Sequence, residues 1–64
     1  MNEEFIDKML KKLGETVRIL RNRKKLTQWE LARLAELDHS YLQKVESGKN
    51  VSVATVFRIC IALD

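Results

Sequence analysis

The chain contains no proline and few glycine, cysteine, histidine or aromatic residues. Its 64 residues include two glycines, one cysteine and one histidine, and aromatic residues make up 6% of the chain. An all-β domain of this length needs many Gly- and Pro-rich turns, so the composition favours helices. The single cysteine, Cys60, excludes an intrachain disulfide. Cys60 and His39 alone do not make a usual zinc site, and we expect no metal or other cofactor.

Long hydrophobic runs and a signal sequence are also missing. The longest apolar stretch, residues 53–63, is interrupted by Arg58. It is far shorter than the roughly 18 apolar residues that indicate a membrane span. The N-terminal sequence MNEEF is acidic, whereas a secretory signal begins with basic residues. We therefore expect a cytoplasmic protein without a membrane partner.

Charge is present in quantity and is unevenly distributed. The formal net charge is +3. Residues 1–7 carry three acidic side chains, residues 8–25 carry eight basic and one acidic, and the remainder carries four basic and five acidic. The strongly basic middle segment attracts polyanions better than the overall charge suggests. The solvated face of a helix shows the same pattern, so charge alone leaves both interpretations open.

Capping signals predict where the helices begin. Asn2 is a plausible N-cap for the first helix, and Thr27 with Glu30 forms a capping box. Asp38 and Ser52 are the predicted N-caps of the next two helices. The predicted helices span about residues 3–24, 28–36, 39–47 and 53–63. Two short helices joined by a tight connection are typical of a helix-turn-helix motif.

Both glycines have a predicted structural role. Gly48 is suited to the position that follows the third helix. Gly14 interrupts the apolar pattern of the first helix, which predicts either a close contact with another helix or a break into two shorter helices.

Apolar side chains on the last helix exceed what a single core requires. They span an arc of about 220° at 100° per residue, whereas a helix packed on one side needs roughly 100°. Ile19 also lies off the main apolar stripe of the first helix. We expect Met9 and Cys60 to fill the core. The excess surface requires a second subunit or a further C-terminal helix, and we expect a homodimer through residues 53–63 and the adjacent apolar surface.

The sequence TQWELA at residues 27–32 and VESGK at residues 45–49 fit the pattern Ser/Thr-Gln-x-x-Leu-Ala followed by Ile/Val-Glu-x-Gly-Lys/Arg. In these residues the chain resembles the phage Cro and repressor-type helix-turn-helix family, also called the XRE family. The resemblance covers about residues 13–63, with the motif itself at about 27–47. Within the family, the chain is similar to the small controller proteins of restriction–modification systems.

This resemblance implies an all-α, lambda-repressor-like fold. The expected domain spans residues 1–64 and has four helices, or is a five-helix domain without its last helix. The implied function is a sequence-specific transcriptional regulator that binds a two-fold symmetric operator in double-stranded DNA as a dimer, with the third helix in the major groove. It implies no enzymatic activity and no small-molecule ligand, and no set of acid, base and nucleophile stands out.

Two other functions fit the same pattern. A protein-interaction module on this fold, such as an antitoxin subunit that holds a toxin, is the main alternative. A basic amphipathic helix at a membrane surface is the more remote one.

Site residues are carried over by position from the resemblance. The base-reading positions are His39, Ser40, Gln43 and Lys44. The phosphate-contacting positions are Thr27, Gln28, Ser47, Lys49 and Asn50. Their chemistry is suitable, because Lys can bond guanine O6 and N7 and Gln can pair with adenine. For His39 and Lys44 the alternative is an ordinary solvated surface residue with no DNA contact.

Three further positions carry structural expectations. The family often pairs an Arg near the end of the first helix with the Glu that closes the third, and Arg21 and Glu46 occupy these positions. Glu36 stands where relatives usually have glycine, which predicts a left-handed backbone there. Trp29 could lie over the sugar–phosphate backbone, pack on a neighbouring chain, or be partly buried against the third helix.

Overall fold

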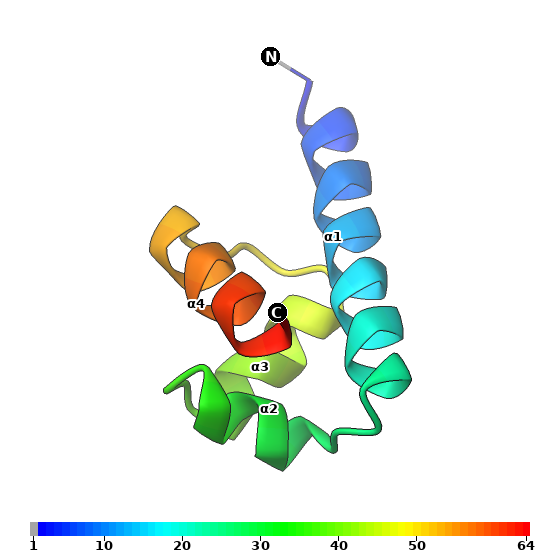
Figure 1. Cartoon of the computed structure of the whole chain (residues 1–64). Coiled ribbons are helices and arrows are strands. Elements are labelled where there is room, and N and C mark those ends of the chain that lie inside the picture. Colours follow the sequence, from blue (N-terminus) through cyan, green and yellow to red (C-terminus); the bar gives the residue numbers. More distant parts are fainter. Residues whose placement is uncertain (1) are drawn as a thin grey trace.

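Four α-helices make up the computed structural model, which describes residues 2–64; Met1 lies outside the described residues. The helices are α1 (Glu3–Arg23), α2 (Gln28–Leu34), α3 (His39–Glu46) and α4 (Val53–Leu63) (Figure 1). Residues 2–64 contain no strand, so the predicted all-α class and the number of helices are confirmed. α1 is continuous and runs along one side of the molecule, with its first turns projecting beyond the other helices (Figure 1).

N-caps begin the helices where the sequence places them. Asn2 accepts a hydrogen bond from the Glu4 backbone N–H at 2.8 Å. At α2 the Thr27 hydroxyl accepts from Glu30 N–H at 3.0 Å, and the Glu30 carboxylate accepts from Thr27 N–H at 2.8 Å. The backbone and then the hydroxyl of Thr27 hold the pKa of Glu30 below its ordinary value. Asp38 occupies the N-cap position of α3 without the side-chain hydrogen bond that the sequence predicts.

The start of α4 is tied to α3. The Ser52 hydroxyl accepts a hydrogen bond from Thr55 N–H at 3.1 Å. The Tyr41 hydroxyl, which belongs to α3, accepts from Ser52 N–H at 3.3 Å. Hydrogen bonds with the Thr55 side chain and the Ser52 backbone lower the pKa of Tyr41. These contacts hold the loop between α3 and α4 against the body of the domain.

The first three helices end in the same way, with a left-handed residue just past the helix. Glu36 has φ 58°, as predicted, Lys25 has φ 59° and Gly48 has φ 92°. Each is followed by a residue whose N–H bonds back to a carbonyl five residues earlier. The bonds are Leu26 to Arg21 at 3.1 Å, Leu37 to Ala32 at 2.8 Å and Lys49 to Lys44 at 2.9 Å. This turn explains why α2 ends at Leu34, two residues before the predicted end.

The core is built from aliphatic side chains of all four helices. They are Val17, Leu31, Ala32, Ala35, Leu42, Val45, Ile59 and Leu63. Met9 is 43% exposed and Cys60 is exposed, so the prediction that both fill the core is wrong. Met9 belongs to the first half of α1, and the first turns of this helix project beyond the other helices (Figure 1). Cys60 lines the open groove between α1 and α4 instead of facing the core.

Gly14 marks the contact between α1 and α3. A Cβ atom added there would lie 2.4 Å from the Val45 carbonyl oxygen and 2.8 Å from that of Glu46. Both oxygens belong to the backbone of α3, so they cannot move aside as a flexible side chain would. Of the two explanations for this glycine, close helix contact is therefore correct and a break in α1 is wrong.

Candidate nucleic-acid interface

Helix α3 separates buried from exposed side chains cleanly. Leu42, Val45 and Glu46 are buried. Ser40, Gln43 and Lys44 are exposed, and His39 is half-buried. A helix repeats every 3.6 residues, so this alternation gives α3 one face locked to the protein and one polar face turned to solvent. The structure brings the four predicted base-reading side chains together on or beside that solvent face.

The start of α3 carries an aromatic contact that the sequence did not predict. The Trp29 ring, from α2, stacks on the His39 imidazole with centroids 3.8 Å apart and an angle of 4° between the planes. Trp29 nevertheless stays 69% exposed. It therefore contacts α3 without the burial that was one of its three expected environments. The sequence predicted only that Trp29 and His39 each lie near the start of a helix. That prediction does not specify a contact between their side chains.

The Glu46 carboxylate joins α1, α2 and α3. It accepts hydrogen bonds from Arg21 Nε at 2.7 Å and Arg21 Nη2 at 3.1 Å. It also accepts one from Gln28 Nε2 at 3.0 Å. The Arg21 and Glu46 side chains are only 12% and 4% exposed. Arg21 Nη1 further donates to the Leu26 carbonyl at 2.8 Å. This network fixes the end of α3 relative to the start of α2.

The predicted phosphate-contacting residues fall in two segments. Thr27 and Gln28 start α2, and Ser47, Lys49 and Asn50 lie in the loop after α3. Four of the five also make hydrogen bonds within the protein: Thr27 and Gln28 in the contacts above, Ser47 with the Lys44 carbonyl, and Asn50 with the Val51 N–H. The role of Gln28 as a partner of Glu46 was not predicted. Lys49 is exposed.

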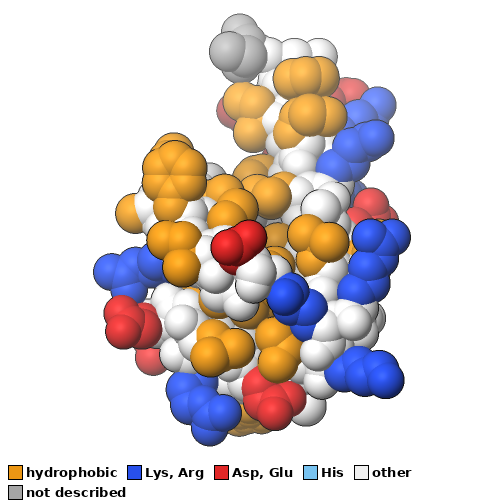
Figure 2. Space-filling view, viewed as in Figure 1, with side chains coloured by type: hydrophobic (Ala, Val, Ile, Leu, Met, Phe, Trp, Pro, Cys, Tyr) orange, Lys and Arg blue, Asp and Glu red, His pale blue; other side chains and the backbone are white. Residues whose placement is uncertain are grey.

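Basic and apolar side chains occupy different parts of the surface. Lys and Arg side chains line the outer edge of α1, on the right in Figure 2. Hydrophobic side chains gather over α4, over the first turns of α1, and between these helices (Figure 2). The most exposed of them on α4 are Val53, Phe57 and Ile61, at 69%, 62% and 77%. The excess apolar surface that the last helix predicts is therefore present.

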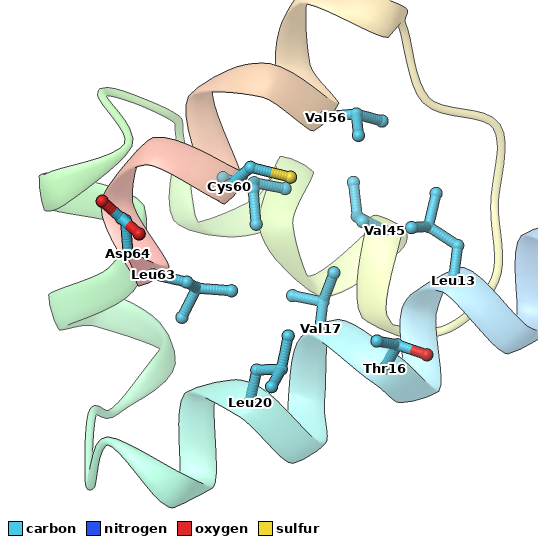
Figure 3. Close-up of a pocket in the computed structure, with 10 residues that line it drawn as sticks. Leu13, Thr16, Val17, Leu20, Val45, Val56, Cys60, Leu63 and Asp64 are labelled. Atoms are coloured by element: carbon cyan, nitrogen blue, oxygen red, sulfur yellow. The ribbon is translucent and has the colours of Figure 1, made fainter.

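An apolar groove separates α1 from α4. Its volume is about 290 Å³. Leu13 and Leu20 from α1 face Val56 and Cys60 from α4 across it (Figure 3). Within residues 2–64 no cluster of three His, Cys, Asp or Glu side chains is placed to hold a metal ion. None of the described helices has the length and apolar character needed to cross a membrane.

Comparison with known proteins assigns the chain to a family. Residues 12–64 match the family described as a helix-turn-helix domain, and the chain belongs to it. The fold is also similar to the crystal structure of the restriction-modification controller protein C.AhdI from Aeromonas hydrophila. That match has a TM-score of 0.82 and 44% sequence identity, and covers 84% of this chain and 83% of that chain. No curated protein matches the chain.

These findings support the resemblance drawn from the sequence. The helix-turn-helix domain and the similarity to a controller protein indicate that this chain is a DNA-binding transcription regulator of the all-α class. The family match begins at residue 12, so the first turns of α1 lie outside it.

Proposed function

We propose that this protein binds a two-fold symmetric DNA operator as a homodimer, with α3 in the major groove. The observation that carries the proposal is the orientation of α3. Its buried face is locked through Leu42, Val45 and Glu46, which leaves Gln43 and Lys44 exposed on the opposite side. A rigidly held helix with a polar outer face is what major-groove recognition requires.

Each exposed residue of α3 has a role in this proposal. Lys44 donates to guanine O6 or N7, and Gln43 pairs with adenine. Ser40 and His39 complete the base-reading set at the first turn of the helix.

Thr27, Gln28, Ser47, Lys49 and Asn50 contact phosphates on either side of the groove. The Gln28 amide nitrogen carries two hydrogens, and only one of them is needed for the bond to Glu46. In this proposal the other hydrogen donates to a phosphate oxygen.

The dimer is proposed from the apolar surface of α4 and the adjoining groove. Val53, Phe57 and Ile61 are exposed beside the groove. A second copy that packs here on a two-fold axis would cover the same patch on both subunits. Two recognition helices related by that axis then read the two halves of a symmetric operator.

The experiment compares sequence-specific base recognition with non-specific electrostatic binding to DNA. Duplexes bound by the wild-type protein are selected from a random pool and sequenced, and affinities are then measured for the selected site and for random duplex. Lys44→Ala should weaken binding to the selected site by about 1–3 kcal/mol and change random binding little. Lys49→Ala should weaken both equally and reduce the slope of log K against log salt by about 0.9 per subunit.

Three outcomes contradict parts of this proposal. Equal losses on both duplexes for Lys44→Ala would move Lys44 to the phosphate-contacting set. Binding without enrichment of any sequence would exclude sequence-specific recognition. Absence of DNA binding would favour the protein-interaction alternative.

A further inference from the structure

Trp29 and His39 form a contact that neither the core nor the proposed contacts explain. They are the only tryptophan and the only histidine in the chain. Trp29 is the second residue of α2, and His39 is the first residue of α3. Tryptophan is highly buried on average in folded proteins, yet this one is 69% exposed. Its one described aromatic contact is the imidazole, 3.8 Å away and nearly parallel.

We infer that Trp29 is a positioning residue for DNA recognition, because its ring holds the His39 imidazole in the orientation in which it meets the bases. The inference rests on the proposed function, since it assigns a second residue to the same recognition surface. Trp29 itself is not required to touch a base.

The backbone that carries Trp29 is fixed on both sides. The preceding residue, Gln28, is bonded to the Glu46 carboxylate. The following residue, Glu30, is held in the capping box with Thr27. The indole is therefore carried on a fixed stretch of backbone at the start of α2. The imidazole stacked on it lies within 4° of the indole plane.

A fixed ring plane matters for recognition. A free histidine at the first position of a helix samples several side-chain orientations in solution. Ordering such a side chain on binding lowers affinity by roughly 2- to 12-fold. The stack orders the imidazole ring before DNA binds. The two ring nitrogens therefore already point in fixed directions.

The fold does not depend on the stack. Leu31 of α2 and Leu42 of α3 are fully buried and belong to the same hydrophobic core cluster. Glu46 joins the same helices at the other end of α3. Removal of either ring at the surface therefore leaves the packing of α2 on α3 in place, and a change in DNA binding can be separated from unfolding.

The stack is tested first in the free protein by proton NMR. Protons of the His39 ring lie over the indole face, so they should resonate upfield of ordinary imidazole positions. In Trp29→Ala they should return to ordinary positions, and in Trp29→Phe they should move only part of the way. Ordinary positions in the wild-type protein would overturn the inference.

Binding is tested by a double-mutant cycle on the selected site and on random duplex. Trp29→Ala should lose about 2- to 12-fold in affinity for the selected site, with random duplex unchanged within about twofold. In the His39→Ala background the same change should have no further effect, because no ring remains to be positioned. Leu34→Ala, at an exposed apolar residue of α2, is the matched control and should bind like wild type.

The remaining outcomes overturn the inference. Additive losses in the double variant, or equal losses on random duplex, would make Trp29 an independent backbone contact. If Lys44→Ala loses discrimination and Trp29→Ala does not, the proposed function stands and the positioning role fails. If the selection enriches no sequence at all, the proposed function and this inference both fail.

Discussion

At the scale of single residues, two non-glycine residues have a left-handed backbone. The sequence predicted this conformation for one of them and not for the other. Glu36 is left-handed, and its position could be predicted because similar helix-turn-helix proteins usually carry glycine there. Lys25 has almost the same φ and gave no such signal. A left-handed turn at a lysine is specified by where the helix must end, and tertiary packing determines that end.

Glu36→Gly should stabilise the protein. A non-glycine residue in the left-handed region costs about 1–2 kcal/mol, and glycine adds some unfolded-state entropy, so a net gain of about 0.5–1 kcal/mol is expected. The ion pair with Arg58, at 3.8 Å and exposed, contributes little. The measurement is the thermal midpoint. Lys25→Gly is the matched variant and should gain similarly, and a lower midpoint in both would contradict the explanation.

The Glu46 carboxylate should be among the side chains on which stability depends most. Glu46→Ala leaves the Arg21 guanidinium almost buried without its anion, which costs about 3–5 kcal/mol. The measurement is the free energy of unfolding in urea. The variant without either charge, Arg21→Ala with Glu46→Ala, should lose much less than the sum of the two single variants. A fully additive result would show that the pair is not coupled.

At the scale of elements, helix starts could be predicted better than helix ends. The capping box of Thr27 and Glu30 is a local pattern, and the structure has both of its hydrogen bonds. Asp38 matches the same local rule but makes no capping hydrogen bond. The rule identifies residues that are able to cap, whereas the orientation of the side chain is decided by its surroundings.

Gly14→Ala should destabilise the protein although alanine favours a helix by about 1 kcal/mol. The added Cβ would meet two backbone oxygens of α3 within 3 Å. Overpacking of this kind typically costs about 1–3 kcal/mol, and it would move α3 away from α1. Glu15→Ala, at the exposed neighbouring position, is the control and should change stability by less than about 0.5 kcal/mol. Equal stability of the two variants would show that the helices can separate at no cost.

At the scale of the whole molecule, the sequence predicted an excess of apolar surface. It did not predict which part of the apolar stripe on α1 the other helices bury. Apolar spacing continues along α1 from Phe5 to Leu20 and places Met9 on that stripe. A helical wheel treats all turns alike, whereas α2, α3 and α4 cover only the second half of α1 (Figure 1). The excess on α4 was predicted correctly, because its arc is wider than any single core can cover.

Self-association should follow from that surface. Sedimentation at high micromolar concentration should show a dimer, and a clean monomer would count against it. Ile61→Ser removes the most exposed large apolar side chain of α4. On a two-fold interface the change acts twice, so the dissociation constant should rise by about 10- to 100-fold. Leu34→Ser, on α2, is the control and should leave the dimer unchanged.

The aliphatic core has an optical consequence. The four aromatic residues, Phe5, Trp29, Tyr41 and Phe57, are all outside the set of fully buried side chains. Tyr41 packs against the core, whereas the single indole is 69% exposed at the edge formed by α2 and α3. Emission should respond to whatever arrives at that edge and stay nearly unaffected by repacking of the interior. Amide circular dichroism therefore reports the folding of the helices, and indole fluorescence reports changes at the edge where Trp29 stacks on His39.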